Sequence, residues 1–161
     1  WTTRIHRLRR ERTSPSAACD AGSMNPRRGQ VPAHATARNV ARFALAALLL
    51  FTGTGHLSWG RRGFRAAVPP YLPVDVDTVV VSSGVAEIAL AASLAVAPAR
   101  FRRVVGAATA AFFVAVFPGN VAHWVSRRDV PGLDTDGKRF ARLFLQPVLV
   151  AWALWSTRGR P

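Results

Sequence analysis

The segment Thr78–Ala97 is uncharged except for Glu87, near its centre. A helix needs about 20 residues, at about 1.5 Å each, to cross the hydrocarbon core of a bilayer, so this segment is long enough to span a membrane. A carboxylate at that depth is costly and requires a partner, a proton or a function. Further apolar segments occupy Asn39–Leu57, Val104–Trp124 and Phe140–Trp155. We therefore predict an all-α fold, a bundle of four transmembrane helices.

Two other interpretations of these segments fit less well. A soluble four-helix bundle would show a polar face repeating every three or four residues. Runs such as Val79–Val81 and Ala110–Phe117 are instead apolar on all sides. The first segment follows basic residues, as in a signal peptide, but no clear small-x-small cleavage site follows it and three more apolar segments do.

The chain is strongly basic, with 22 Lys and Arg against 8 Asp and Glu and a formal net charge of +14. Such a charge often marks nucleic-acid binding, but here arginines flank the apolar segments, where guanidinium groups reach lipid headgroups. The clusters are Arg27–Arg28, Arg61–Arg65, Arg100–Arg103, Arg127–Arg128 and Arg158–Arg160. We therefore expect the lipid bilayer, and not nucleic acid, as the partner of these residues.

The single cysteine, Cys19, precludes an intramolecular disulfide, a CxxC pair and a thiolate metal cluster, so any redox role would need a bound cofactor. It lies in a polar, arginine-rich region, residues 1–23, ahead of the only methionine, Met24. We expect either a start of translation at Met24 or a disordered basic tail before it. The predicted organisation is a basic, disordered segment at 1–37, a membrane domain at 38–157 and a short basic tail at 158–161.

The loops indicate how the helices connect. The short link at 100–103 makes the second and third helices an antiparallel hairpin. The longer first loop, 58–77, has an amphipathic start followed by prolines, which predicts a short interfacial helix. Basic residues slightly favour the side of the N-terminal arm and the tail, so we expect both termini in the cytoplasm and the protein in the cell (inner) membrane.

Polar residues within the predicted spans fall in one half of the membrane. Four alternating spans place the end of the first, the start of the second, the end of the third and the start of the fourth on one side. The candidate pocket there comprises His56, Glu87, Asn120, His123, Arg142 and Gln146. Glu87 should lie at its deep end, with Arg142 and Gln146 as neighbours, and either locks the helices in register or takes part in function.

A metal centre is not predicted. His56 and His123, at one level on different helices, superficially match a two-histidine, one-carboxylate set with Glu87. Glu87 should, however, lie too deep to join histidines near the interface. Paired axial histidines for a haem have no other support in the sequence.

An ordered set of short motifs resembles the DoxX family of bacterial four-helix membrane proteins. The matching residues are Gly55–His56, Phe64, Val68–Pro73, Ser83–Glu87, Phe117–Asn120 and Leu145–Gln146, within about Arg38–Thr157. The resemblance implies an integral membrane protein, and some members are associated with thiosulfate:quinone oxidoreductase or with membrane-linked thiol redox defence. This chain has no cysteine in any predicted span, so thiol chemistry by the protein itself is not expected.

Two functions therefore stand side by side, and whether the protein is an enzyme stays open. The first is a membrane redox accessory that binds a quinone in the pocket, with membrane or redox proteins as partners. In that case His56, His123 or Gln146 would hydrogen-bond to the quinone carbonyls. The second is a non-enzymatic small carrier or a membrane assembly and scaffold protein.

Overall fold

Every element that the structure describes is a helix. The computed structural model describes residues 33–130, 132 and 134–159, so most of the predicted segment 1–37 and the end of the predicted tail lie outside the described residues. The elements are α1 (Ala33–Leu57), α2 (Arg61–Arg65), α3 (Val76–Val96), the short 3₁₀ helix η2 (Ala99–Phe101), α4 (Arg102–Ser126) and α5 (Asp136–Ser156). The predicted all-α fold is thus confirmed, and α2 is the short helix expected in the first loop.

The helices extend beyond the apolar segments that predicted them, chiefly at their N-terminal ends. α1 begins at Ala33 and not at Asn39, so the predicted boundary at residue 38 falls inside a helix. α5 begins at Asp136, because the Thr135 side chain accepts a hydrogen bond from the backbone of Lys138 and caps the first turn. Polar residues form these first turns as readily as apolar ones. Hydropathy alone therefore places the first residue of each helix too late in the sequence.

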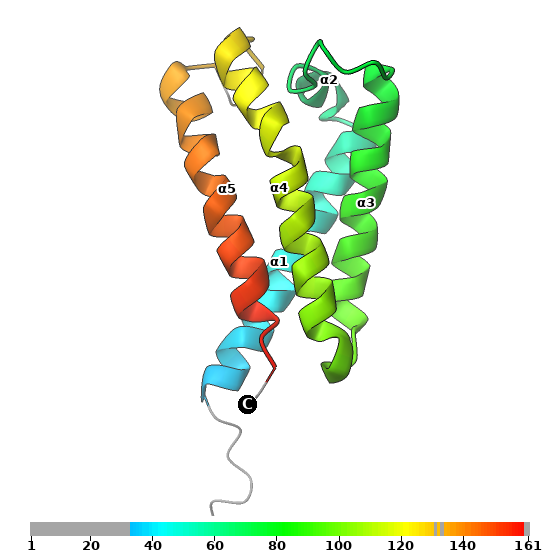
Figure 1. The fold of residues 1–161 in the computed structure, drawn as a ribbon, viewed down its shortest axis with the longest axis vertical. Helices are drawn as coiled ribbons and strands as arrows, with labels where there is room; N and C mark the ends of the chain where they lie inside the picture. Colours follow the sequence, from blue (N-terminus) through cyan, green and yellow to red (C-terminus); the bar gives the residue numbers. More distant parts are fainter. Residues whose placement is uncertain (1–32, 131, 133, 160–161) are drawn as a thin grey trace, which may run out of the picture. The chain divides into compact units, whose positions relative to one another are not determined.

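The four long helices alternate in direction and associate as two antiparallel pairs, α1 with α3 and α4 with α5 (Figure 1). The α2 end of the bundle is defined here as the end that holds α2 and the loops 58–75 and 127–135. Both ends of the described chain lie at the opposite end (Figure 1).

Two glycines allow α1 and α3 to approach closely. A Cβ atom on Gly53 would lie 2.9 Å from the Gly84 carbonyl oxygen, and a Cβ on Gly84 would lie 2.7 Å from the Cβ of His56. Small residues at a helix contact are a common device in membrane bundles. This contact sets how deep in the bundle the polar residues of α1 lie relative to those of α3.

The bundle is packed with apolar side chains in the half away from α2. This core contains Leu45, Leu49, Leu94, Ala110, Phe113 and Ala153, together with Ala46, Ala91 and Leu149. In the half nearer α2 the interior is not filled in the same way, and the polar residues collect there.

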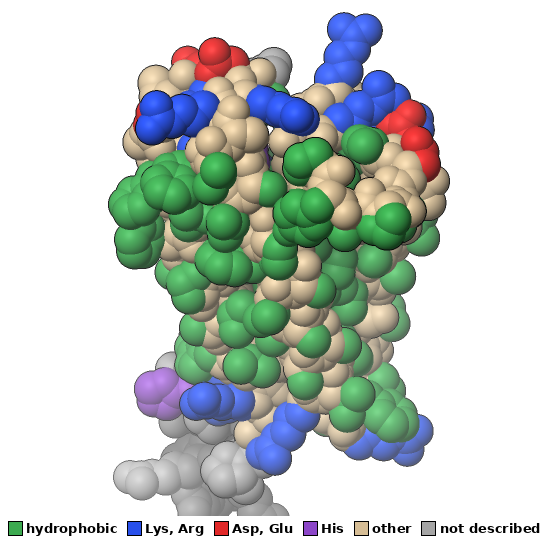
Figure 2. Space-filling model, turned by 45° about the horizontal axis from the view of Figure 1, so that its top comes forward, with side chains coloured by type: hydrophobic (Ala, Val, Ile, Leu, Met, Phe, Trp, Pro, Cys, Tyr) green, Lys and Arg blue, Asp and Glu red, His purple; other side chains and the backbone are tan. Residues whose placement is uncertain are grey.

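The outer surface has a broad apolar band between two charged rims (Figure 2). Phe43, Phe51, Val85, Val114 and Phe144 each expose half or more of their surface. Within the described residues, three helices are long and apolar enough to cross a membrane, namely His34–Leu57, Val76–Val96 and Ala99–Ser126, and the predicted fourth span is not among them. These features make it a helical protein with membrane-spanning character, as the sequence predicted.

The two rims differ in charge. At the α2 end, acidic and basic residues alternate in ion pairs, such as Arg65 with Asp77 at 2.5 Å and Lys138 with Asp134 at 2.6 Å. The opposite rim carries only basic residues among those described, namely Arg38, Arg100, Arg102, Arg103 and Arg158.

Candidate functional site

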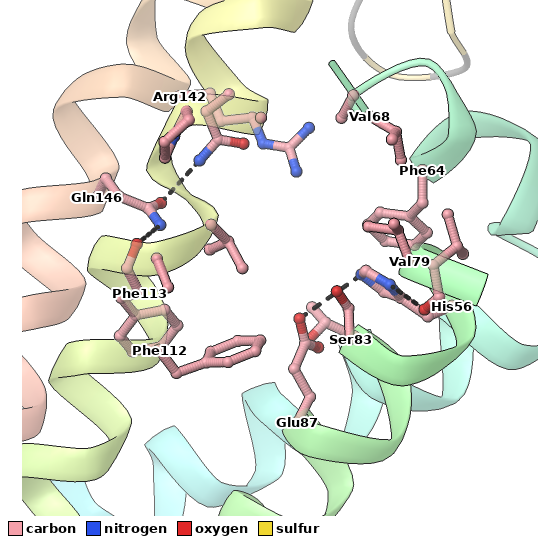
Figure 3. Close-up of a pocket in the computed structure, with 18 of the residues that line it drawn as sticks. His56, Phe64, Val68, Val79, Ser83, Glu87, Phe112, Phe113, Arg142 and Gln146 are labelled. Atoms are coloured by element: carbon pink, nitrogen blue, oxygen red, sulfur yellow. Dashed lines mark hydrogen bonds and ion pairs between the residues drawn. The ribbon is translucent and has the colours of Figure 1, made fainter. Parts of the chain in front are cut away.

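A cavity of about 510 Å³ lies between the two helix pairs, in the half of the bundle nearer α2 (Figure 3). Its walls are mostly apolar and come from all four long helices. They include Leu48, Leu49, Val79, Val80, Phe112, Phe113, Val116, Leu145 and Leu149. Phe64 of α2 and residues between Ala67 and Leu72, in the loop that follows α2, cover it at the α2 end.

Glu87 lies in the wall formed by α1 and α3. Its side chain is buried, and its carboxylate accepts a hydrogen bond from the Thr52 hydroxyl. The other carboxylate oxygen, Oε1, lies 3.6 Å from Nε2 of His56. On its far side the His56 ring has Nδ1 3.2 Å from the Val80 carbonyl oxygen.

The contact between Glu87 and His56 corrects the prediction that Glu87 lies too deep to reach the histidines. The two residues lie on opposite sides of the Gly53–Gly84 contact, and each is three residues away from it, or about 4.5 Å along its helix. In a helix the Cα–Cβ bonds tilt toward the N-terminus. Because α1 and α3 are antiparallel, the two side chains tilt toward each other and close the gap between their backbones.

The geometry of this pair constrains where its protons can lie. Nδ1 of His56 faces a carbonyl oxygen, which can only accept, so Nδ1 carries a hydrogen. In a neutral imidazole Nε2 is then an acceptor, and it faces the Glu87 carboxylate. The contact is attractive only if one further proton sits on Nε2 or on Glu87. The pair is therefore a place where the protein can hold or release a proton.

The opposite wall, formed by α4 and α5, contains a chain of amides. Asn120 donates from Nδ2 to Oε1 of Gln146 over 3.0 Å, and Gln146 donates from Nε2 to the Phe113 carbonyl oxygen over 2.7 Å. Both side chains are buried. Gln146 is thus bound to its own helix pair, and the predicted contact between Gln146 and Glu87 is not present.

Arg142 lies one turn from Gln146 on the same face of α5, and its guanidinium points into the cavity (Figure 3). It is half-buried and makes no hydrogen bond or ion pair with any described residue. The predicted pairing of Glu87 with Arg142 is therefore replaced by the contact with His56. A guanidinium has five N–H donors and no acceptor, so this wall offers donors to a molecule in the cavity.

His123 is the one predicted pocket residue that does not line the cavity. It is 1% exposed, and its Nε2 lies 2.9 Å from the backbone carbonyl oxygen of Arg128. It therefore holds the end of α4, where Arg127 adopts a left-handed conformation with φ of 50°. His56, Glu87, Asn120, Arg142 and Gln146 do line one cavity.

Two residues that support the site were not predicted as part of it. Thr52 precedes His56 by four residues, a spacing that places both on one helix face and could have identified it. Phe64 stacks on the His56 ring with 3.5 Å between centroids, a contact that no spacing in the sequence reveals. Among the described residues, no group of three or more His, Cys, Asp or Glu side chains is placed to hold a metal ion.

Two buried arginines were also missed. Arg42, 3% exposed, donates to the carbonyl oxygens of Leu94 and Ala95 at the C-terminal end of α3. Arg139, 4% exposed, pairs with Asp129 and Asp136 at the α2 end. Both positions are structural: Arg42 satisfies backbone carbonyls at the C-terminal end of α3, and Arg139 ties the loop after α4 to the first turn of α5 through two carboxylates.

Comparison with known proteins yields one family. No curated protein and no solved structure matches this chain. A family model described as a domain of unknown function, DUF8561, matches residues 45–157, which include the second half of α1, all of α3, α4 and α5, and every residue that lines the cavity. This range is more than half of the 161 residues. The chain therefore belongs to the DUF8561 family.

Proposed function

We propose that this protein is a four-span protein of the bacterial inner membrane, resembling the DoxX family, that binds a quinone in its cavity as an accessory to a membrane redox enzyme. The observation that carries the proposal is Arg142, whose guanidinium points into a mostly apolar cavity opposite the His56–Glu87 pair. A partner protein would supply the electrons, and this chain would bind and orient the ring.

The proposal includes a fourth membrane span, α5. Its charged side chains are confined to its first two turns, and Arg142 and Gln146 face the cavity and not the outside. Outward-facing side chains farther along, such as Phe144, Val148 and Leu154, are apolar. Polar groups that face the interior are the usual exception to apolarity in a membrane helix.

Four spans place both chain ends on one side of the membrane. The rim at that end carries arginines and, among the described residues, no acid. Basic residues collect on the cytoplasmic side of membrane proteins. We therefore assign that rim to the cytoplasm and the cavity to the half of the membrane away from it.

A quinone ring matches the chemistry of the two cavity walls. The ring is flat and apolar and carries carbonyl oxygens at opposite edges. One oxygen would accept hydrogen bonds from Arg142, and the other would face the proton held by His56 and Glu87. The cavity volume of about 510 Å³ is typical of small-molecule sites.

The test is quinone binding by the purified full chain in lipid nanodiscs, followed by quenching of its tryptophan fluorescence. Arg142→Gln keeps much of the side-chain length but removes the charged fork, so it should weaken binding about ten- to a hundredfold. Arg103→Gln, at the opposite rim, is the matched control and should bind as the wild type does. Absence of binding by the wild type, or equal binding by Arg142→Gln, would refute the proposal.

One observation favours the alternative, a non-enzymatic carrier or assembly protein. The Asn120–Gln146–Phe113 chain is bonded within its own helix pair, as expected of groups that only hold helices together. On that alternative, Glu87→Gln would leave the co-purification of a membrane partner unchanged, and no quinone would be found with the protein.

A further inference from the structure

A second hollow lies on the outside of the bundle, beside the cavity. It has a volume of about 560 Å³ and runs along the last turns of α4 under Pro70 and Tyr71. This outer groove is lined chiefly by Tyr71, Phe117, Pro118, Val121, Ala122 and Val125. Its lining is mostly apolar and extends to Ser126, next to Arg127, so in a membrane it would lie at the edge of the apolar band beside the charged rim.

The outer groove adjoins the cavity. Tyr71 and Pro118 line both hollows, so these two side chains form part of the wall between them. α3 and α4 contact each other far less than α1 and α3 do. The loop after α2 packs on α4 here, and a Cβ on Gly119 would lie 2.9 Å from the Ala67 carbonyl oxygen.

The two ends of the cavity do not suit an apolar chain. Its inner end is closed by packed side chains, including Leu45, Leu94 and Ala153. Above its roof lies the charged rim with ion pairs such as Arg65–Asp77. The wall at Tyr71 and Pro118 is the side where an apolar path continues outward, because seven of the eight residues that line the outer groove are apolar or aromatic.

We infer that the outer groove binds the apolar chain of an amphiphilic ligand whose head occupies the cavity. The chain is the isoprenoid or alkyl tail of the quinone, and it passes between Tyr71 and Pro118 to reach the bilayer. This inference rests on the proposed function, because it requires a head in the cavity. It adds the ligand class, a long-chain membrane quinone, and its route of entry from the lipid.

The experiment compares two quinones that share one head, one without a tail and one with a ten-carbon alkyl chain. Binding to the full chain in phosphatidylcholine nanodiscs is expressed against the mole fraction of quinone in the lipid, which removes the effect of partitioning. On this scale the tail already lies in an apolar solvent before it binds, so any gain comes from dispersion contacts with the side chains of the outer groove. We expect these contacts to make the wild type bind the long-chain quinone about tenfold more tightly.

Ala122→Trp fills the outer groove and should remove this tenfold difference without changing the binding of the tailless quinone. Ala108→Trp, which adds the same bulk to an exposed position of α4 outside both hollows, should keep the difference. If Ala122→Trp fails to fold by circular dichroism, Val125→Trp replaces it, since Val125 is 67% exposed in the same groove.

The outcomes separate the two proposals. If the tailless quinone does not bind the wild type, the proposed function fails. If the tailless quinone binds but the alkyl tail adds no affinity, lipid chains occupy the groove and the inference alone is overturned. The same holds if the groove-filling variants keep the full difference in affinity between the two quinones.

Discussion

Glu87 and His56 form the contact on which the cavity's chemistry depends. Hydrogen bonds from Thr52 and toward Val80 hold the two side chains, and Phe64 covers the imidazole ring. Each of these groups is on a wall that a ligand would touch. The contact therefore bears both on the stability of the fold and on ligand binding in the cavity. Substitutions of Glu87 can separate these two effects.

Glu87→Gln should leave the free energy of unfolding within about 1 kcal/mol of the wild type, whereas Glu87→Leu should lower it by about 1–3 kcal/mol. The glutamine amide can accept from Thr52 and donate to Nε2 of His56. Leucine leaves Nε2 of His56 without a partner, while the Thr52 hydroxyl keeps the Leu48 carbonyl oxygen of its own helix as an acceptor. Reversible unfolding in mixed detergent micelles measures the difference. Equal stability of the two variants would show that the contact contributes nothing to folding.

Asp134 provides a prediction about pH at the α2 end. Lys138 donates to its carboxylate over 2.6 Å and lowers the pKa of Asp134 below its ordinary value. Folding favours the charged form, so the contribution is present above the ordinary aspartate pKa and is lost as pH falls through the lowered pKa. Both side chains are more than half exposed, so the effect on stability should be small.

An NMR titration of Asp134 checks this shift directly. Lys138→Met should return the pKa of Asp134 toward the ordinary aspartate value, because the hydrogen bond from Lys138 is its main cause. An unchanged titration in the variant would show that Lys138 does not pair with Asp134 in solution.

At the scale of elements, the α1–α3 pair is set by backbone contact between glycines. Gly53 and Gly84 bring the two helices close enough for their polar side chains to meet. The position of this crossing along α1 and α3 decides which residues of the two helices lie at the same depth in the bundle. The sequence shows the glycines, but it does not state that these two face each other.

Gly84→Ala should therefore destabilise the protein by about 1–3 kcal/mol, since its new Cβ would lie 2.7 Å from the Cβ of His56. Gly137→Ala in α5 is the control, because a Cβ there meets no atom within 4 Å. The control should be neutral or slightly stabilising, as expected for alanine in a helix. Thermal unfolding followed by circular dichroism compares the two. A melting temperature for Gly84→Ala that equals that of the control would contradict the close packing.

At the scale of the whole molecule, the apolar band and the two rims define how the bundle lies in a membrane. The rim at the α2 end has balanced charges, and the other rim has only basic residues among those described. With four spans, the ends of α3 and α5 lie on the same side. This topology can be tested without knowledge of the ligand.

Single cysteines in a Cys19→Ser background should react differently with a membrane-impermeant maleimide. Arg62→Cys, on exposed α2, should be labelled in intact spheroplasts. Arg103→Cys and Arg158→Cys, at the opposite rim, should be labelled only after the membrane is opened. Labelling of Arg158→Cys together with Arg62→Cys, but not of Arg103→Cys, would show that α5 does not cross the membrane.

Much of this molecule could be predicted because hydropathy and length are local properties. The apolar segments identified four long helices, and the alternation of their direction gathered Asn120, Arg142 and Gln146 near one end. His123 shows the limit. It lies three residues from Asn120, but its ring turns to the Arg128 carbonyl and not into the cavity, a choice that depends on the loop after α4.

The sequence by itself determined that this is an all-helical protein with membrane-spanning segments and a polar group of residues in one half. Those conclusions need only the number of residues per span and the order of the charges along the chain. Only the tertiary structure decided that Glu87 meets His56, and that Arg142 is left facing the cavity. The physical reason is that partners across helices depend on the crossing at Gly53 and Gly84 and on the tilt of side chains in antiparallel helices, which depth along a single span cannot supply.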